Sequence, residues 1–358
     1  MARLGDYVNI KTGKLDANAS SENGRYPFFT CSVEPLRIDT YSYDCECVLV
    51  AGNGDLNVKY YNGKFDAYQR TYIIESNDKE VLSVPYLYCF LDKYVETLRK
   101  QSIGGVIKYI KLGNLMEADI PLCSIEEQLE IVKTLEKVNK IIADRKTQLL
   151  KLDELVKSRF IELFGDTPDG EKVAMADICR IITDGTHQPP KFVSEGIPFL
   201  FVSNIVTNEI RYDAQKFISE ETYAELIKRT PIAIGDILLS TVGSYGHPAV
   251  VKTEKPFCFQ RHIAYLKPDA DKVDSEYLRG AILSVDVQRQ IDEGVKGIAQ
   301  KTLNLSEIRK IRLPLPPIDL QKQFAAFVEQ TDKSKLEIQQ SLDKLETLKK
   351  ALMQQYFG

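Results

Sequence analysis

The sequence predicts an α+β protein in which two mixed α/β domains alternate with two long helices that pair in one coiled coil. The first observation is a repeat: Ile120-Pro-Leu-Cys-Ser-Ile-Glu-Glu-Gln128 returns 193 residues later as Leu313-Pro-Leu-Pro-Pro-Ile-Asp-Leu-Gln321. At the same offset, Leu163-Phe164-Gly165 returns as Tyr356-Phe357-Gly358. Internal repeats are the sequence signature of a duplicated architecture. We therefore expect a pseudo-twofold molecule.

The second observation is an apolar period of about 3.5 residues after each copy of the repeat, which is typical of a coiled coil. Each rod of roughly 37 residues would be about 55 Å long. Arg145 and Arg159 occupy two further positions of the first seam. The alternative is two unrelated amphipathic helices on separate domains. The predicted seam comprises Leu135, Val138, Ile142, Leu149, Leu152, Val156, Leu163, Val328, Ile338, Leu342, Leu345, Leu352 and Tyr356.

The repeat divides the chain into four parts, in agreement with the two or more domains expected for 358 residues. Proline precedes both helices and Gly165 follows the first, where these residue types delimit helices. The segment from Asp166 to Lys172 is rich in Asp, Pro and Gly and is predicted to be a linker. The predicted parts are domain 1 (1–119), helical spacer 1 (120–165), domain 2 (166–312) and helical spacer 2 (313–358).

Short strands separated by Gly, Asn and Pro turns are predicted in both domains. They include Val48–Val50, Lys59–Tyr61, Ile237–Leu239 and Ile263–Leu266. A weaker repeat, whose offset drifts as small loop insertions would cause, relates the domains to each other. Its members are Glu46–Gly54 with Gly235–Gly243, Gln69-Arg70 with Gln260-Arg261, and Tyr86 with Tyr277.

Composition and charge exclude several classes of protein. The apolar fraction of 44% is ordinary for a globular protein, and no run approaches the ~20 apolar residues of a membrane span. Seven scattered cysteines without a CxxC pair, and a start unlike a signal peptide, predict reduced thiols in a cytoplasmic protein. Cys45 and Cys47 would share one strand face, where we expect buried packing. The net charge is −4 and no part is basic, which argues against a non-specific coat on DNA.

Signatures of catalysis are missing from the sequence. It has no GxxxxGK[ST] phosphate loop and no HExxH zinc motif. Gln188-Pro-Pro-Lys191 fails at both ends of the [DNS]PP[YF] methyltransferase motif, and His187, His247 and His262 lack partners at metal-ligand spacing. We therefore expect no catalytic residue, no metal and no cofactor in this chain alone. A DNA-modifying enzyme with an unrecognised site remains an alternative.

The order of these motifs, present twice, resembles the specificity (S) subunit of type I restriction–modification systems. The resemblance covers essentially the whole chain. Leu313–Gln321 looks like the start of the helical spacer in that family. The segments that look like target recognition domains are Gly24–Phe29 and Tyr61–Arg70 in the first domain, and Asp184–Pro189, Gly196–Phe199 and Gly235–Ser240 in the second.

The resemblance implies that each target recognition domain reads one half of a split double-stranded DNA site. The two helices would pair antiparallel as a spacer that docks two methyltransferase subunits, and restriction or translocase subunits could join. S-adenosylmethionine, and ATP with Mg²⁺ if a restriction subunit is present, would belong to the partners. The first spacer has Cys123-Ser124 where the second has Pro316-Pro317, so the two helices need not dock partners equally. A coiled-coil scaffold without a DNA role is the other alternative.

Base reading requires side chains with two hydrogen-bonding atoms, such as Arg for guanine and Asn or Gln for adenine. Ordinary turn chemistry also explains clusters of Asn, Asp and Gly. Gly54, Gly63, Gly185 and Gly243 are expected to be backbone requirements. Gln69-Arg70 and Gln260-Arg261 are the leading candidates because they recur. Two domains that read different half-sites should differ at base contacts, so the alternative is that the pairs hold phosphates or the fold. The candidate DNA contacts are Asn53, Asp55, Asn57, Lys59, Tyr60, Lys64, Gln69, Arg70, Thr186, His187, Gln188, Lys191, Ser203, Asn204, Ser244, Tyr245, Gln260, Arg261 and His262.

Overall fold

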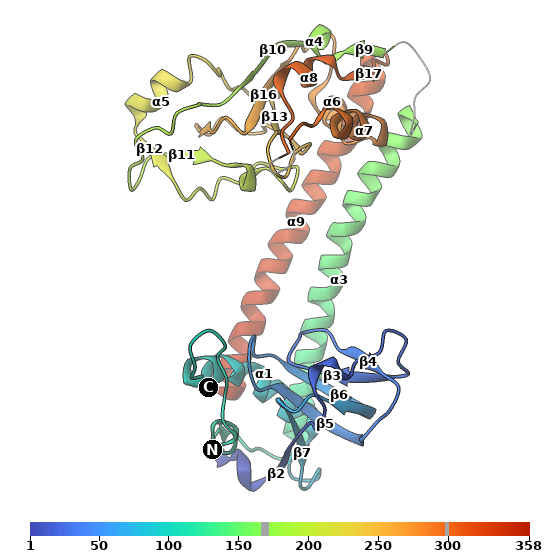
Figure 1. Cartoon of the computed structure of the whole chain (residues 1–358), viewed down its shortest axis with the longest axis vertical. Coiled ribbons are helices and arrows are strands. Elements are labelled where there is room, and N and C mark those ends of the chain that lie inside the picture. The colour runs from blue at the N-terminus through green and yellow to red at the C-terminus, as the bar shows by residue number, and fades with distance from the viewer. Residues whose placement is uncertain (166–171, 298–300) are drawn as a thin grey trace. The chain divides into compact units, whose positions relative to one another are not determined.

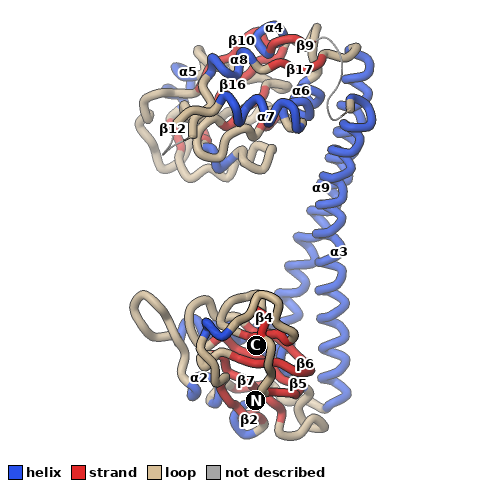
Figure 2. The backbone as a smooth tube through the Cα atoms, turned by 45° about the vertical axis from the view of Figure 1, so that its right-hand side comes forward, coloured by secondary structure: helices blue, strands red, loops and turns tan. Residues whose placement is uncertain are grey.

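The computed structural model describes residues 1–165, 172–297 and 301–358, so the linker predicted from Asp166 lies outside the described residues up to position 171. The chain forms two compact units, which Figure 1 traces from blue to red and Figure 2 colours by secondary structure. Unit 1 comprises Met1–Thr147 and Gln339–Gly358, and unit 2 comprises Gln148–Ile338. Each unit therefore contains one α/β domain and parts of both long helices. The four-part division of the chain stays a prediction.

The strands of unit 1 form a large sheet and a two-stranded one. They are β1 (Ala2–Arg3), β2 (Val8–Thr12), β3 (Tyr26–Phe29), β4 (Leu36–Ile38), β5 (Tyr43–Ala51), β6 (Val58–Ala67), β7 (Thr71–Ser76) and β8 (Asp119–Ile120). The large sheet has the order β2-β7-β5-β6-β3-β4, and β1 pairs with β8. All neighbours are antiparallel except β3 and β6. The strands predicted at Val48–Val50 and Lys59–Tyr61 are confirmed.

Both faces of β5 are buried, as its apolar run requires. Val48 and Val50 face helix α1 (Val84–Gln101), whereas Cys47 and Leu49 belong to a second core on the opposite face. Cys45 packs against that second core, so the predicted packing of both thiols on one face is confirmed. The short elements of unit 1 are η1 (Leu4–Asp6), η2 (Ala17–Ala19) and α2 (Leu112–Met116).

Unit 2 repeats the strand order of unit 1 with one interruption. Its strands are β9 (Lys172–Ala174), β10 (Cys179–Asp184), β11 (Ile197–Leu200), β12 (Phe217–Ile218), β13 (Ile237–Ser240), β14 (Pro248–Val250), β15 (Cys258–Phe259), β16 (Ile263–Pro268) and β17 (Arg312–Pro314). The antiparallel order β10-β16-β13-β14 matches β2-β7-β5-β6. The parallel pair β11–β15 matches β3 with the end of β6. Thus β14 and β15 together take the place of the single strand β6.

The helices of unit 2 are also broken where unit 1 has one. Helices α6 (Ser275–Ile282) and α7 (Val285–Gly294) replace α1, because Ser284 caps a new helix by accepting from the N–H of Val287 at 3.4 Å. The remaining elements are η3 (Val202–Asn204), α4 (Met175–Ile178), α5 (Glu220–Leu226) and α8 (Leu305–Lys310).

The two long helices are α3 (Ile125–Phe164) and α9 (Ile318–Phe357), each of 40 residues. Both end in glycine with positive φ, 78° at Gly165 and 89° at Gly358. The N–H groups of these glycines bond to carbonyls of Ile161 and Gln354 at 2.7 and 3.0 Å. The repeated C-terminal glycine is therefore a helix cap.

In unit 1, the beginning of α3 packs against the end of α9. Leu135 shares a core with Met353 and Phe357, and Lys146 pairs with Glu346 at 3.1 Å. Residues near the N-terminus of α3 thus contact residues near the C-terminus of α9, so the two helices are antiparallel in this unit. The predicted coiled-coil pairing is confirmed in this unit.

In unit 2, the end of α3 packs against the beginning of α9. The ring of Phe160 lies 5.4 Å from that of Phe324, and Lys335 forms an ion pair with Asp153. The direction is again antiparallel. All the predicted seam residues of both helices are buried or half-buried. The predicted seam included Tyr356 but not the phenylalanines at the helix ends, which also belong to these cores: Phe160, Phe164, Phe324 and Phe357.

Gln128 explains why glutamine recurs in the repeat. It is fully buried in unit 1 and its Oε1 accepts from the N–H of Ser83, the N-cap of α1, at 2.9 Å. Its Nε2 donates to the carbonyls of Val81 and Cys123 at 2.8 and 3.0 Å. Because every polar atom of the amide is satisfied, the side chain joins the long helix to the start of the domain helix.

Gln321 makes the same contacts in unit 2. Its Oε1 accepts from the N–H of Asp274, the N-cap of α6, at 2.8 Å, and its Nε2 donates to the carbonyl of Pro316 at 2.7 Å. It is also fully buried. The glutamine of each repeat is therefore a structural lock between helix and domain.

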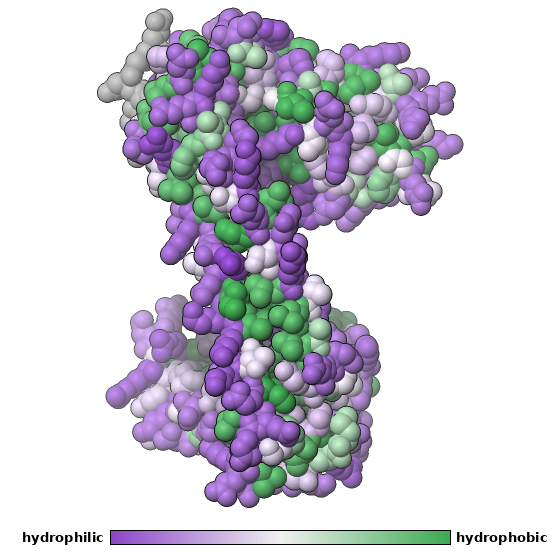
Figure 3. Space-filling model, turned by 180° about the vertical axis from the view of Figure 1, so that it is seen from behind, coloured by the Kyte–Doolittle hydropathy of each residue, from purple (hydrophilic) through white to green (hydrophobic). Residues whose placement is uncertain are grey.

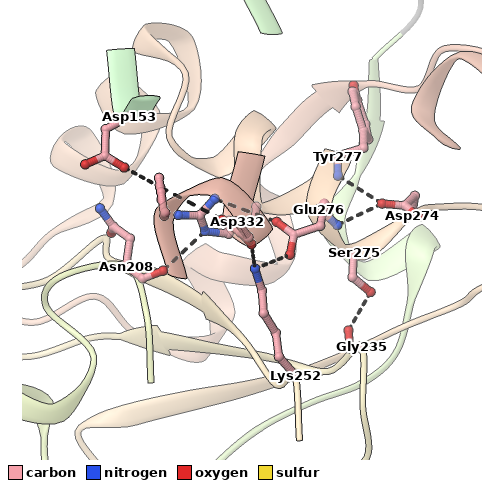
Figure 4. A network of polar contacts seen from close by, with 11 residues as sticks. Asp153, Asn208, Gly235, Lys252, Asp274, Ser275, Glu276, Tyr277 and Asp332 are labelled. Carbon is pink, nitrogen blue, oxygen red and sulfur yellow. Dashed lines mark hydrogen bonds and ion pairs between the residues drawn. The ribbon is translucent and has the colours of Figure 1, made fainter. Parts of the chain in front are cut away.

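In unit 2, an ion-pair network joins the end of β14 to α6 and α9. Lys252 lies between Glu276 of α6, at 3.0 Å, and Asp332 of α9 (Figure 4). Burial disfavours the charge of Lys252, but the two carboxylates outweigh burial and raise its pKa.

None of the described helices is long and apolar enough to cross a lipid bilayer.

Candidate nucleic-acid interface

In unit 1, three segments meet where the central strand β5 ends. The N–H of Gly52 donates to the carbonyl of Arg70 at 2.8 Å, and the N–H of Ile110 donates to the carbonyl of Gly52 at 2.9 Å. The N–H of Gly54, whose φ is 70°, donates to the carbonyl of Lys108 at 2.9 Å. We call this surface loop end 1. Its segments are residues 52–57, 68–70 and 102–110.

In unit 2, the same three segments meet at the end of β13. The N–H of Thr241 donates to the carbonyl of His262 at 3.0 Å, and the N–H of Leu303 donates to the carbonyl of Thr241 at 2.8 Å. The N–H of Gly243, whose φ is 73°, donates to the carbonyl of Lys301 at 3.1 Å. We call this surface loop end 2. Its described segments are residues 241–247, 260–262, 295–297 and 301–304.

These hydrogen bonds correct the predicted equivalence of the two Gln-Arg pairs by one residue. The carbonyl that meets the end of the central strand belongs to Arg70 in unit 1 but to His262 in unit 2. Gln69 therefore corresponds to Arg261, and Gln260 precedes the equivalent turn positions. The apparent recurrence is a coincidence of composition, because the sequence pattern contains no hydrogen-bond register. The two domains differ at both turn positions.

Most candidate residues of unit 1 lie at loop end 1. Gln69 and Arg70 are exposed in the turn, and Gln69 donates to Asp16 at 2.9 Å. The amide of Asn57 donates to the carbonyl of Cys31 at 2.8 Å and its oxygen accepts from Lys59. Burial lowers the pKa of Lys59.

Asn53 and Asp55 complete the hairpin of loop end 1. Asn53 is half-buried and forms a β-bridge with Tyr109. Asp55 is exposed and lies 3.4 Å from a guanidinium nitrogen of Arg99. These two residues therefore lie beside Gln69 and Arg70, on the segment that the glycines hold in place.

Tyr60 and Lys64 lie away from loop end 1. The hydroxyl of Tyr60 donates to Glu46 at 2.8 Å on the side of the sheet that α1 covers. Lys64 lies opposite Asp44 in the strand register, near the other end of β5, and its ammonium lies 4.6 Å from the ring of Tyr41. The structure thus gives both side chains other partners.

In unit 2, the loop after β10 reaches the turn of loop end 2. Thr186 forms a parallel bridge with Gln260, while His187, Gln188 and Lys191 are exposed. Gly185 cannot be replaced without movement, since a Cβ there would lie 2.2 Å from the carbonyl oxygen of Phe259. The predicted backbone role of this glycine agrees with that contact.

An open pocket of about 400 Å³ lies beside Arg261 and His262 and is also lined by Asp184, Thr302 and Asn304. Asp184 already forms an ion pair with Arg229, and its other carboxylate oxygen lies 2.9 Å from Nε2 of His187. Burial lowers the pKa of His262, and Arg261 lowers it further. A neutral imidazole can both donate and accept a hydrogen bond at pH 7.

Four candidates of unit 2 remain: Ser203, Asn204, Ser244 and Tyr245. Asn204 is buried, and its amide bonds the N–H of Phe201 and the carbonyl of Arg211, both at 3.0 Å. Ser203 is its exposed neighbour in η3. Tyr245 follows the exposed Ser244 and donates to Asp292 of α7 at 2.9 Å, so it supports the loop. The polar group of Asn204 is not available to a base.

Lys108 and Lys301 are the residues that sequence reasoning missed. They are exposed, and their carbonyls hold Gly54 and Gly243 in the two loop ends. The signal was present, since the two lysines are separated by the same 193 residues as the helical repeat.

Among the described residues, no group of three or more His, Cys, Asp and Glu side chains could hold a metal ion. The loop ends can form hydrogen bonds and charge contacts.

A family model for the type I restriction modification DNA specificity domain matches residues 1–152 and 169–350. The chain is 36% identical over 154 residues to the specificity subunit of the type I restriction enzyme EcoDI of Escherichia coli. That match covers 43% of this chain and about a third, 34%, of the relative. The MjaVIII specificity subunit of Methanocaldococcus jannaschii is 21% identical over 388 residues, covering 99% of this chain and 90% of that protein.

Two solved structures have the same fold. The S subunit of a type I restriction–modification system from M. genitalium has a TM-score of 0.63 at 16% identity and covers 100% of this chain and 95% of its own. A chain from a structural study of complex assembly and conformational transition in a type I system has a TM-score of 0.57 at 18% identity. That likeness covers 99% of this chain and 96% of the other.

Proposed function

The chain belongs to the type I restriction–modification DNA specificity family, and on this premise we propose that it is the DNA sequence-recognition subunit of such a system. One observation carries the proposal: both domains present exposed polar side chains on the same three-segment loop end. Loop ends on a rigid sheet are suitable for recognition because the scaffold positions them. Each loop end would read one half of a split site in double-stranded DNA.

The two loop ends would read different half-sites. Gln69 and Arg70 stand where Arg261 and His262 stand in the other domain. Glutamine pairs with adenine and arginine with guanine in the major groove, so these exchanges change the preferred base. The candidate residues that lie on the loop ends would make the base and phosphate contacts.

The long helices would set the separation of the half-sites and dock two methyltransferase subunits. On the duplex, the half-sites would be about one turn apart, ~34–36 Å. Apolar side chains gather on the exposed faces of the long helices (Figure 3). Exposed apolar patches mark protein interaction sites. The exposed residues are Leu129, Ile141 and Leu348 in unit 1, and Leu150, Leu155, Ile161 and Leu336 in unit 2.

The chemistry of the complex would lie in the partner subunits. S-adenosylmethionine would bind to the methyltransferase, and ATP with Mg²⁺ would bind to a restriction or translocase subunit where one joins. This chain would contribute recognition and no catalytic residue, and it would act in the cytoplasm, where the DNA and these partners are.

Base-resolved sequencing of methylated DNA tests the proposal. Cells that carry this gene with its neighbouring methyltransferase gene are compared with cells that lack this gene alone. Loss of one split motif with a fixed spacer is the expected result. An unchanged methylation pattern, with the methyltransferase confirmed as expressed, would refute the proposal and favour a coiled-coil scaffold without DNA recognition.

A further inference from the structure

The third segment of each loop end is a loop closed in the same way in both domains. Ile103 and Tyr109 exchange two backbone hydrogen bonds, at 3.0 and 2.9 Å. Lys296 and Thr302 exchange the equivalent pair, also at 3.0 and 2.9 Å. The residue after the first partner is glycine with positive φ each time, 117° at position 104 and 105° at position 297. The described residues that close the two loops therefore have the same hydrogen bonds and the same glycine position.

Each loop places one lysine at the same point. Lys108 and Lys301 come just before Tyr109 and Thr302, and their carbonyls accept from the two glycines of positive φ in the hairpin loops. Both lysines are exposed. Neither forms an ion pair with any residue in the described ranges, and the ammonium of Lys301 lies 6.0 Å from the ring centre of Tyr245.

The neighbours of these lysines differ between the domains. Asn53 bridges to the first loop where Val242 bridges to the second. Gln69 likewise stands where Arg261 stands. Two domains that read different half-sites must differ at base contacts, whereas every half-site offers the same phosphodiester backbone. A cation that recurs while its neighbours vary is therefore suited to phosphate.

We propose that Lys108 and Lys301 are matched phosphate contacts, one in each loop end, that bind duplex DNA regardless of sequence and set the register in which their neighbours read bases. The inference rests on the proposed recognition function. It favours DNA over an acidic protein surface because both lysines lie on the loop ends, beside the turn that carries Gln69-Arg70 or Arg261-His262.

The test measures how the DNA affinity of the full chain, in complex with its methyltransferase subunits, depends on salt. Duplexes with and without the methylated motif are compared for wild type and K108Q/K301Q. The plot of log K against log salt has a negative slope, and each lost phosphate contact makes that slope less steep by about 0.9. For K108Q/K301Q we expect a slope that is less steep by about 1.8 on both duplexes. The ratio of wild-type affinity to variant affinity should therefore decrease about tenfold between 50 and 200 mM salt.

Two variants serve as controls. K79Q/K272Q removes two lysines that follow β7 and β16, at the opposite ends of these strands, with side chains 59% and 54% exposed. It should leave the slope unchanged. K108R/K301R keeps both charges and should restore the wild-type slope, which separates loss of charge from any disturbance of the loops.

The outcomes separate the lysine inference from the proposed function. A wild-type complex that shows no preference for the motif refutes the function itself. A wild-type preference together with an unchanged slope in K108Q/K301Q refutes the phosphate contacts alone. Weaker assembly with the methyltransferase at an unchanged slope would assign the lysines to a protein partner, and a loss confined to the motif duplex would make them base readers. Both results overturn the inference.

Discussion

The two α/β domains share one scaffold, yet they support their loop ends with different residues. In unit 1, Arg99 of the single helix α1 donates to the carbonyl of Leu56 at 2.8 Å. In unit 2, the broken helix brings Gln288 of α7 to the carbonyl of Gly246 at 3.0 Å. Gln128 and Gln321 are shared and buried, whereas Arg99 and Gln288 differ between the units and support the exposed loops.

This difference shows where a duplicated fold can change its specificity. The tyrosine of each domain helix donates to a proline carbonyl before the long helix at 2.6 Å, from Tyr86 to Pro121 and from Tyr277 to Pro314. A change there would leave a buried polar group without a partner in either domain. The replacement of β6 by β14 and β15 in unit 2 does not change this tyrosine–proline hydrogen bond. Loop ends can therefore diverge while the joint between domain and helix stays constant.

The largest predicted effect is a loss of stability in one unit at a time, after replacement of the phenylalanine at the end of one long helix. Phe164 packs on Tyr277 at 4.8 Å in unit 2, and Phe357 packs on Tyr86 at 5.3 Å in unit 1. Phe164→Ala and Phe357→Ala should each cost about 4 kcal/mol, because each leaves a cavity in a buried aromatic cluster. Hydrogen exchange should show opening of α6 in the first variant and of α1 in the second.

Exposed leucines on the same helices provide the control for these phenylalanines. Leu155 and Leu348 are both 47% exposed, so their replacement by alanine should change stability by less than about 0.5 kcal/mol. Equal loss of protection in both domains after Phe164→Ala would contradict the assignment of that residue to unit 2.

The next effect concerns the buried glutamines. Gln128→Ala and Gln321→Ala should each destabilise the protein by about 3 kcal/mol, because each leaves buried backbone groups without a partner. Denaturant unfolding measures the loss. Gln323→Ala, at an exposed position of α9, should be nearly neutral. A much smaller cost at one glutamine than at the other would break the equivalence of the two joints.

A smaller effect should appear in recognition alone. Arg99→Ala removes the hydrogen bond to the carbonyl of Leu56 and the contact with Asp55, and Gln288→Ala removes the hydrogen bond to the carbonyl of Gly246. Each of the two hydrogen bonds to a hairpin carbonyl is worth about 1 kcal/mol. Each variant should weaken discrimination at one half-site by up to about tenfold and leave the other half-site unchanged. Binding to duplexes mutated in one half at a time measures this. A loss at both half-sites from one variant would show that the loop ends are coupled.

The smallest effect is a pH response confined to unit 2. A hydrogen bond from Lys172 lowers the pKa of the buried Asp286, against its burial and with help from Arg289. A depressed carboxyl pKa stabilises the fold above the unfolded value of about 3.9, and the contribution is lost as the pH falls through the folded pKa. Unit 2 should therefore lose about 1 kcal/mol below about pH 4.

Asp286→Asn tests this response. The variant should be less stable than wild type at pH 7, and the difference should disappear in acid. Thermal unfolding between about pH 7 and pH 3 measures both proteins. A constant difference across that range would show that the ion pairs of Asp286 do not carry the pH dependence.

The sequence alone predicted the repeat, the two long helices, the central strands and the alternation of domains and helices. These features depend on apolar periods and on prolines and glycines that act locally, as Gly165 and Gly358 do at the helix ends. It also pointed to most residues of the loop ends, because polar residues and glycine cluster in hairpins. The family resemblance agrees with the match over both halves of the chain.

Only the tertiary structure decided the register of the turns and the availability of each side chain. Gln69 corresponds to Arg261 because hydrogen bonds to the central strand align the turns, and residue identity does not report such bonds. Asn204 and Tyr60 have polar groups like those of a base reader, but Arg211 and Glu46 already accept hydrogen bonds from them. Local patterns determine which elements form, whereas the hydrogen bonds and burial of the folded chain determine which polar groups remain free.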